Sequence, residues 1–209
     1  MIIENFIVFE GIDGAGTTTQ MRKLAERLPP DKIALSAEPT DRETGRFLRR
    51  MLRGEFQTDS RTAAYLFAAD RAEHLYGAGG ILEQAAGGRL AVSDRYLFSS
   101  LAYQSVSCGE ALPRLLNSAF PLPKLLFYFK IPPEQALERV AARGGTRELY
   151  EQLGYQQKAA ERYESVIREY MRPELSGGMT VITVDAAASV GEISEFIWNH
   201  VRNLPIHKA

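Results

Sequence analysis

The stretch FEGIDGAGTTTQ, residues 9–20, is a glycine-rich run near the start of the sequence. It follows a short apolar run and precedes a segment rich in helix formers. A glycine-rich turn between a strand and a helix can wrap phosphate groups with its backbone N–H groups at the N-terminus of the helix. The spacing G-x-x-x-x-G is present from Gly11 to Gly16. We therefore predict a phosphate-binding loop at the end of the first strand.

The residue after Gly16 departs from the usual pattern of such a loop. Lysine is expected there, but the sequence has Thr17, and Thr18 follows at the position whose hydroxyl would bind Mg²⁺. A glycine-rich turn of this kind can also be purely structural. The loop alone leaves both interpretations open, and other segments must decide between them.

Short apolar runs alternate with longer helix-like segments along the rest of the chain. Runs of this kind are typical of buried strands, and the longer segments are typical of crossover helices. We expect an α/β fold with a five-stranded parallel sheet and helices on both faces, built as a single domain over residues 1–209. The expected strands are 6–10, 33–36, 90–93, 125–129 and 181–184, and the expected helices are 18–28, 45–53, 61–76, 98–107, 133–143, 155–171 and 190–204.

Charge and cysteine content narrow the class of protein. The 209 residues include 25 basic and 26 acidic ones, a net charge of -1, so no overall positive field favours a nucleic acid or an anionic membrane. Cys108 is the single cysteine, which excludes an intrachain disulfide and is typical of a reducing compartment. No apolar run approaches the roughly 20 residues of a membrane-spanning helix. We expect a cytoplasmic protein with no nucleic-acid or membrane partner.

Three further motifs follow the loop in order. They are Glu38-Pro39-Thr40 with Gly45 and Arg49, the run LFAADR at 66–71, and DRY at 94–96 with SSLAYQ at 99–104. In order and spacing, the loop and these motifs resemble the thymidylate kinase family of P-loop nucleoside monophosphate kinases, and together they span most of the chain. The resemblance implies transfer of the γ-phosphate of ATP to dTMP, giving dTDP and ADP for dTTP synthesis. It also implies Mg²⁺ as cofactor and a homodimer.

Phe67 and Arg71 are the candidate base-binding pair. They stand four residues apart in an expected helix, so they share one face. A flat ring there can stack on a base while the neighbouring guanidinium hydrogen-bonds a carbonyl. Taken alone, the pair would sooner indicate a core phenylalanine beside a solvated arginine. The resemblance assigns the pair to the thymine of dTMP.

Asp94 and Arg95 follow the expected strand 90–93. Their side chains therefore emerge at the carboxyl end of a central strand, where open α/β sheets bind ligands. The resemblance implies that Arg95 and Arg49 clamp the phosphate of dTMP and that Asp94, with Thr18, lies at the metal. Both Asp94 and Arg95 are expected to act in catalysis. The alternative is an ion pair at the end of a strand.

The resemblance also assigns the remaining nucleotide contacts. It places Gln104 at the base edge with Ser100 on the same helix, Tyr103 near the sugar C2′, and Asp13 at the 3′-hydroxyl. The expected ATP-binding residues are Gly11, Ile12, Asp13, Gly14, Ala15, Gly16, Thr17, Thr18 and Thr19, and the expected dTMP-binding residues are Asp13, Arg49, Phe67, Arg71, Arg95, Ser100, Tyr103 and Gln104.

The segment 143–155 resembles the mobile lid of the same kinases. It contains Arg143 and Arg147 around a pair of glycines, which provide hinge-like freedom. The family places a stabilising arginine in either the phosphate loop or the lid, and this loop has none. Arg143 and Arg147 are therefore candidate catalytic cations, and a solvated basic loop is the alternative.

Lys130 is a second candidate for the missing positive charge. Losing one preorganised donor commonly costs about 3 to 4 kcal/mol in catalysis, and Thr17 cannot supply that charge. Lys130 ends the fourth expected strand, where similar kinases often carry an acidic or neutral residue. If that strand lies beside the first, Lys130 is near the loop and can replace part of the charge. The alternative is a lysine that extends into solvent.

Two other functions remain open. The first is a kinase of another pyrimidine (deoxy)nucleotide, because Phe67 and Gln104 can bind a pyrimidine base but do not distinguish a base with a methyl group from one without it. The second is a catalytically silent nucleotide-binding protein, which the substitution at Thr17 suggests. The complete set of acceptor-side residues argues against the silent protein.

Overall fold

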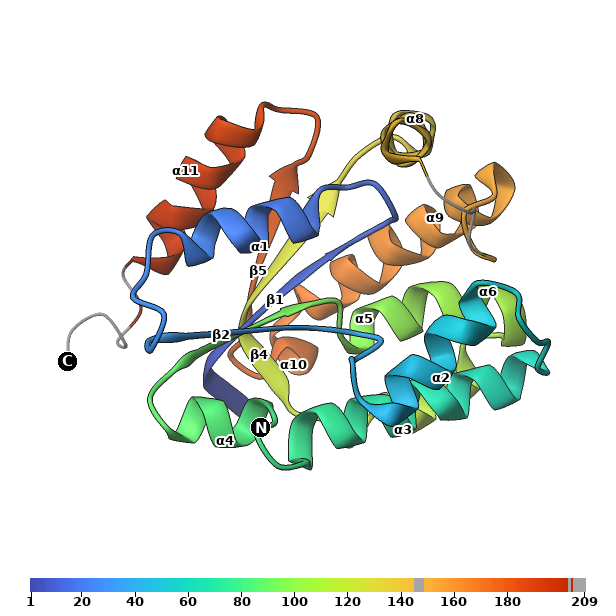
Figure 1. Ribbon diagram of the computed structural model, residues 1–209, viewed down its shortest axis with the longest axis horizontal. Coiled ribbons are helices and arrows are strands. Elements are labelled where there is room, and N and C mark those ends of the chain that lie inside the picture. Colours follow the sequence, from blue (N-terminus) through green and yellow to red (C-terminus); the bar gives the residue numbers. More distant parts are fainter. Residues whose placement is uncertain (145–148, 203, 205–209) are drawn as a thin grey trace.

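A five-stranded parallel sheet forms the centre of the molecule in the computed structural model (Figure 1). The structure describes residues 1–144, 149–202 and 204, without the side chain of Arg143. The strand order is β2-β3-β1-β4-β5, and every pair is parallel. The strands are β1 Ile2–Gly11, β2 Ile33–Ala37, β3 Leu90–Asp94, β4 Leu122–Lys130 and β5 Thr180–Asp185. The predicted fold class is confirmed.

The central strand β1 is apolar because both of its faces are covered. Four successive side chains, residues 6–9, are 0% exposed. Parallel strands covered by helices on both sides show such continuous apolar runs, whereas half-exposed strands alternate. In the register of the sheet, Phe9 of β1 lies beside Asp94 of β3, and Gly11 lies beside Phe129 of β4. The carboxyl ends of these three strands therefore meet at one edge of the sheet.

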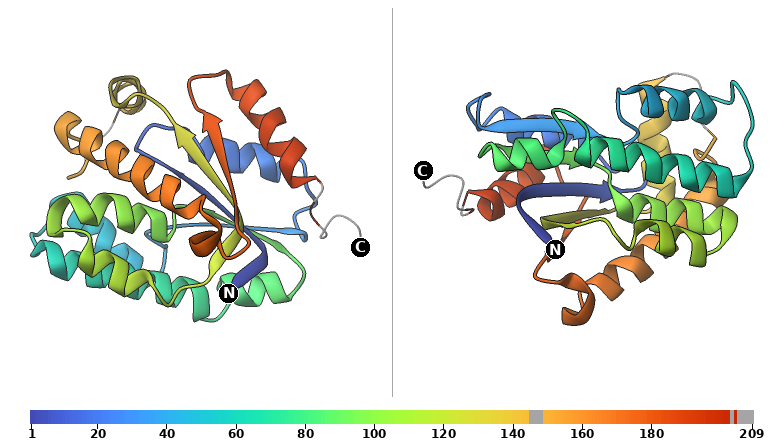
Figure 2. Two further views of the ribbon diagram at one scale, coloured as in Figure 1. Left: turned by 180° about the vertical axis from the view of Figure 1, so that it is seen from behind. Right: turned by 90° about the horizontal axis from the view of Figure 1, so that it is seen from below.

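Helices cover the sheet on both sides (Figures 1 and 2). On one side, α1 packs against β1, β2 and β3 and against α11. On the other side, α4 and α5 contact β1, and η1 packs against α3, α7 and α9. The helices are α1 Thr17–Ala25, α2 Glu43–Leu52, α3 Ser60–Tyr76, α4 Ile81–Ala86, α5 Leu97–Ser99, η1 Ser100–Gln104, α6 Ser105–Cys108, α7 Ala111–Asn117, α8 Pro133–Arg143, α9 Leu153–Tyr170, α10 Pro173–Ser176 and α11 Val190–Val201.

The helices differ from the sequence-based expectation in two respects. Three of them, α4, α7 and α10, were not expected, because elements of 6, 7 and 4 residues are too short to display a helical period. The expected helix 98–107 corresponds to a run from α5 to α6 that contains a π-helical turn, η1. Such turns widen a helix locally and often occur at functional sites. This one contains Ser100, Tyr103 and Gln104.

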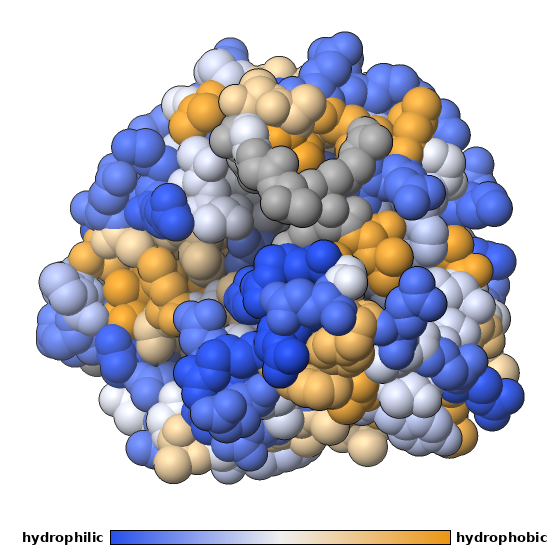
Figure 3. Space-filling view, turned by 45° about the vertical axis from the view of Figure 1, so that its right-hand side comes forward, coloured by the Kyte–Doolittle hydropathy of each residue, from blue (hydrophilic) through white to orange (hydrophobic). Residues whose placement is uncertain are grey.

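The surface contains no broad apolar band on the face that Figure 3 presents. Hydrophilic residues predominate there, and apolar residues form separate patches. In the described part of the chain, no helix is long and apolar enough to cross a membrane.

Gly14 fixes how closely the phosphate loop packs against α8. Its φ is +89°, and an added Cβ would lie 2.1 Å from the carbonyl oxygen of Ala136. Side chains rarely adopt this backbone conformation, and the contact is too short for any side chain. Glycine is therefore required at this position by both conformation and space.

We expect Gly14→Ala to lower the free energy of unfolding by about 2 to 5 kcal/mol. The cost of a left-handed backbone conformation for alanine adds to the cost of overpacking the new Cβ against α8. Gly88→Ala is the matched control, since Gly88 has a φ of +78° and open space around its Cβ position. That control is expected to lose only about 1 to 2 kcal/mol. Chemical denaturation measures both, and equal losses would contradict a role for close packing at Gly14.

Candidate active site

A cavity of about 550 Å³ opens at the carboxyl edge of the sheet. It extends from the phosphate loop to α2 and α3, so it brings together segments that are far apart in the sequence. Among the predicted site residues, the cavity is lined by Ile12, Asp13, Gly14, Gly16, Thr17, Thr18, Arg49, Phe67, Arg71, Asp94, Arg95, Tyr103 and Gln104. Gly11, Ala15, Thr19, Ser100 and Lys130 are not part of its lining.

Thr18 and Asp94 meet at the start of α1. The Thr18 hydroxyl donates a hydrogen bond to Oδ2 of Asp94. The other carboxylate oxygen, Oδ1, is buried and has no hydrogen-bond partner among the described residues. Leaving a buried carboxylate oxygen without a partner is costly, so this atom is available for a ligand at the cavity wall.

Arg95 joins the end of β3 to the phosphate loop. Its φ is +75°, the only positive value for a non-glycine residue in the described chain, and its backbone N–H donates to Phe9 O at 2.8 Å. Its guanidinium donates through Nη2 to Asp13 Oδ1 at 2.5 Å and through Nη1 to Gly11 O at 3.0 Å. Strained backbone of this kind persists where the surroundings hold it, and it is frequent in active sites.

Gln156 is a site residue that the sequence did not reveal. It lies in the first turn of α9, is fully buried, and donates from Nε2 to Asp13 Oδ2 at 2.6 Å and to Tyr150 O at 2.9 Å. Tyr103 also donates toward Asp13 Oδ2, at 3.2 Å, and burial raises the pKa of Tyr103, which keeps its hydroxyl protonated. Asp13 is thus held from three sides. A glutamine in an amphipathic helix carries no local sign of such a contact.

Glu10 is a second buried group that the sequence did not single out. Its carboxylate accepts from Tyr96 N at 2.8 Å, Ser99 N at 3.1 Å, Ser99 Oγ at 2.7 Å and Tyr163 OH at 2.8 Å. Burial raises the pKa of Glu10 to about 7, although these hydrogen bonds and the Arg95 charge lower it. Ser99 Oγ and Tyr163 OH also accept from Arg95 Nη1, at 3.2 and 3.4 Å. Glu10 therefore supports Arg95 through two hydroxyl groups.

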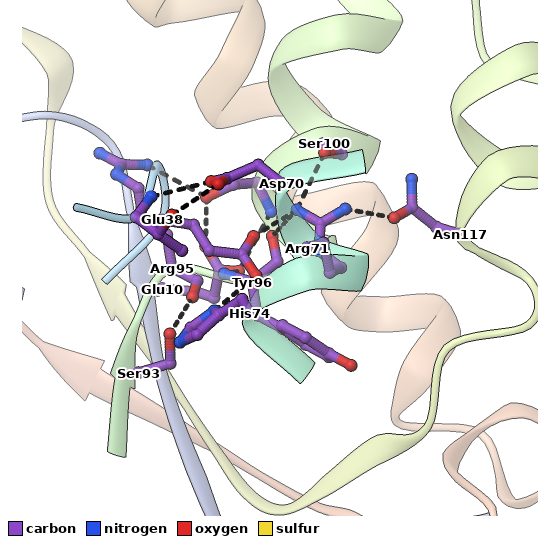
Figure 4. Close-up of polar contacts among 12 residues, drawn as sticks. Glu10, Glu38, Asp70, Arg71, His74, Ser93, Arg95, Tyr96, Ser100 and Asn117 are labelled. Atoms are coloured by element: carbon purple, nitrogen blue, oxygen red, sulfur yellow. Dashed lines mark hydrogen bonds and ion pairs between the residues drawn. The ribbon is translucent and has the colours of Figure 1, made fainter. Parts of the chain in front are cut away.

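At the far end of the cavity, Arg71 of α3 is enclosed by polar partners (Figure 4). Its Nη2 donates to Glu38 Oε2 at 2.6 Å, to Tyr96 O at 3.0 Å and to Ser100 Oγ at 3.1 Å, and its Nη1 donates to Asn117 Oδ1. Its Nε is buried without a described partner. Ser100 therefore reaches the site through Arg71 even though it does not line the cavity.

Arg49 and Phe67 line the cavity from α2 and α3. Arg49 of α2 donates from Nη2 to Pro39 O, lies 3.7 Å from the Asp41 carboxylate, and has a buried Nε without a described partner. Phe67 packs against the small apolar cluster that contains Leu48. A cation and an aromatic ring thus face the same space from two helices. Phe67 belongs to the lining of the cavity as well as to this apolar packing.

The cations that could replace the missing lysine differ in where they lie relative to the cavity. Strand β4 does lie beside β1, but the Lys130 amine is bound to Glu164 Oε1 of α9 at 2.8 Å and its side chain is 56% exposed. This contact does not favour the predicted role. The side chain of Arg143 and all of Arg147 lie outside the described residues. Arg22 of α1, which the sequence did not single out, is exposed and lines the cavity near Thr18.

Comparison with known proteins gives the family. The family model described as thymidylate kinase matches residues 9–197. A relative in Treponema pallidum is 43% identical over 96% of both chains, and one in Methanocaldococcus jannaschii is 33% identical over 98% of this chain and 100% of its own. A third, in Leptospira interrogans, is 38% identical over 78% of this chain and 81% of its own. All three carry the name thymidylate kinase, the first two provisionally.

The chain belongs to the thymidylate kinase family. Membership confirms the activity predicted from the sequence, an ATP-dependent phosphorylation of dTMP to dTDP. It does not favour the two alternatives, a kinase of another pyrimidine nucleotide and a silent nucleotide-binding protein. In this member of the family the loop joins β1 to α1, and the substitution at Thr17 leaves it in place.

Glu10 gives a pH-dependent prediction. Its pKa is about 7 in the folded chain against an ordinary 4.5, so the folded state binds the proton more tightly than the unfolded state between these values. The free energy of unfolding should therefore fall as pH rises from about 4.5 to about 7, by roughly 3 kcal/mol from this group. Glu10→Gln should remove this contribution. Denaturant unfolding of both proteins across that range measures the difference, and parallel curves would contradict it.

Proposed function

We propose that ATP and dTMP react in this cavity, with the phosphate loop holding the ATP phosphates and α2, α3 and η1 holding dTMP. The observation that carries the proposal is the shape of the cavity, which joins the loop to Arg49, Phe67 and Arg71 in one space. The start of α1 supplies backbone N–H groups and a partial positive charge for the phosphates of ATP. The ATP-binding residues are those of the loop, from Gly11 to Thr19.

The residues at the start of α1 fit Mg²⁺. The ion prefers oxygen ligands and is usually held by one or two protein groups together with phosphate oxygens and water. Thr18 Oγ and the unpartnered Asp94 Oδ1 are such groups, side by side at the cavity wall. No cluster of three or more histidine, cysteine or acidic side chains suits a metal among the residues that the structure describes. Bound with ATP, Mg²⁺ would neutralise negative charge on the transferring phosphate.

The acceptor nucleotide is held by complementary groups. Arg49 and Arg95 clamp its phosphate, because guanidinium groups match phosphate oxygens with paired hydrogen bonds. Phe67 stacks on the thymine, and the free Nε–H of Arg71 and the amide of Gln104 hydrogen-bond the base edge.

Asp13 and Tyr103 complete the acceptor site at the sugar. Asp13 accepts from the 3′-hydroxyl, and Tyr103 lies against C2′. Because Asp13 already accepts from Arg95, Tyr103 and Gln156, the sugar enters a site whose geometry is fixed in advance.

Transfer follows directly between the two nucleotides. The phosphate of dTMP attacks the γ-phosphate of ATP in line, and no covalent enzyme intermediate forms. Arg95 sits between the loop and the acceptor, so its charge is placed to stabilise the transferring phosphoryl group. The remaining positive charge comes from a cation other than the loop lysine. The lid, residues 143–155, supplies it through Arg143 or Arg147, with Arg22 and Lys130 as the other candidates.

Assembly and location complete the proposal. We propose a single-domain enzyme that works as a homodimer in the cytoplasm without a nucleic-acid or membrane partner. The outer face of α3 supports the dimer, because Tyr65 and Tyr76 are more than half exposed there on one side of the helix. The single Cys108 is compatible with a reducing compartment.

Coupled release of ADP from ATP, Mg²⁺ and dTMP tests the proposal. We expect turnover of about 1 to 100 per second, the range of comparable kinases. Phe67→Ala and Arg49→Ala should raise the KM for dTMP and leave the KM for ATP nearly unchanged. Tight binding of dTMP without ADP release would favour the silent nucleotide-binding protein.

Alanine variants of Arg22, Lys130, Arg143 and Arg147 locate the replacement cation. Truncating the residue that carries the charge should lower kcat about 10²- to 10³-fold, which is the effect of removing one preorganised donor. Arg168→Ala is the matched control, since Arg168 is exposed near the end of α9 and does not line the cavity. Losses below about threefold for all four variants would contradict a relocated cation.

A further inference from the structure

Glu38 and His74 form a buried relay behind the base-binding arginine (Figure 4). Glu38 is 6% exposed, His74 is 4% exposed and Arg71 is 1% exposed. Glu38 Oε2 accepts from Arg71 Nη2 at 2.6 Å, and His74 Nδ1 lies 3.0 Å from Glu38 Oε1. The two carboxylate oxygens are thus bound by two different residues of α3. The proposed function places Arg71 at the thymine, and a role for the relay in dTMP binding rests on that placement.

The chemistry of the relay fixes its proton positions. Arg71 is always charged, so Glu38 beside it is ionised and can only accept hydrogen bonds. The Nδ1 atom of His74 must therefore carry the proton that points at Glu38. The other ring nitrogen, Nε2, is buried and has no hydrogen-bond partner among the described residues. The side chain of His74 consequently has one polar contact among the described residues, and its partner is Glu38.

The position of Glu38 in the wall of the cavity explains why its carboxylate must be held in place. Glu38 lines the cavity, which must accept the anionic phosphates of two nucleotides. A carboxylate that turned toward that space would repel the phosphate of dTMP and release Arg71 from its bound position. Its backbone N–H donates to Asp94 O at 3.0 Å, so the main chain of Glu38 is tied to the end of β3. The remaining freedom lies in the side chain, where Arg71 binds Oε2 and His74 fixes the second oxygen, Oε1.

We propose that His74 is a positioning residue for dTMP binding: it holds the Glu38 carboxylate beside Arg71 and so keeps Arg71 oriented toward the base. His74 itself does not line the main cavity. It lines a second hollow of about 260 Å³ beside β2, so a ring of similar size can replace it without a clash. The role is specific to the acceptor, because the side chains of Glu38 and His74 bind Arg71 and each other, the backbone N–H of Glu38 binds Asp94, and none of these hydrogen bonds among the described residues goes to the phosphate loop.

His74→Phe and His74→Asn separate this role from simple packing. The phenylalanine keeps the ring and loses the donor, whereas the asparagine amide can present an N–H near the position of Nδ1. We expect His74→Phe to raise both the dissociation constant and the KM for dTMP about tenfold, the effect of one lost hydrogen bond to a charged group, with kcat and the KM for ATP changed less than about threefold. His74→Asn should recover most of the affinity.

Ser36→Ala is the matched control, because Ser36 lines the same second hollow and loses only a hydrogen bond to Val92 O. It should leave the affinity for dTMP unchanged. In a Glu38→Ala background, His74→Phe should add less than about twofold, because the carboxylate that His74 positions is absent. A tenfold effect of His74→Phe that persists in that background, or an asparagine variant as weak as the phenylalanine variant, would overturn the proposal.

Calorimetric titration with dTMP alone keeps this test separate from the test of catalysis. Unchanged dTMP affinity in His74→Phe, in an enzyme that turns over normally, overturns the positioning role and leaves the proposed function standing. Weakened dTMP binding in His74→Phe, in a protein whose wild type binds dTMP without releasing ADP, supports the positioning role and overturns the proposed catalysis.

Discussion

The ion pair between Arg95 and Asp13 is the contact on which the site depends. It joins the end of β3 to the phosphate loop after β1. Both partners are partly buried, so the pair is shielded from water and from the screening that weakens surface pairs. Arg95 adopts a left-handed backbone conformation at the end of β3, and its backbone N–H donates a hydrogen bond to Phe9 O. The fold itself therefore fixes Arg95 against the phosphate loop.

A layer of buried polar residues holds that pair in position. Glu10 reaches Arg95 through Ser99 and Tyr163, and Gln156 binds Asp13 from α9. At the other end of the cavity, Arg71 is fixed by Glu38, Ser100 and Asn117. Preorganised groups of this kind need little rearrangement when charge develops during transfer. The cost is several buried charged groups, and Asp94 Oδ1 and Arg71 Nε among them have no hydrogen-bond partner in the described residues.

The sequence predicts the sheet and most of the cavity wall, and it misses the supporting layer. Local patterns identify the strands, and the ordered motifs identify Asp13, Phe67, Asp94 and Arg95, because each motif is a short run with its own chemistry. Glu10, Gln156 and Glu38 with His74 have partners 33 to 153 residues away. No local period marks such contacts, which arise only when the chain is folded. For Lys130, the sequence predicts the position beside the loop, because that position follows from the order of the strands. It does not predict the contact with Glu164, which appears only in the folded chain.

We propose that another cation of this chain replaces the charge of the loop lysine. Thr17 begins α1, lines the cavity and is buried, so a lysine placed there would enter the phosphate site. The most direct test is the single-turnover rate of phosphoryl transfer in Thr17→Lys. If another cation already supplies the charge, restoring the lysine should raise the rate by less than about tenfold. A gain of about 10²- to 10³-fold, the full effect of one preorganised donor, would show that the charge was missing.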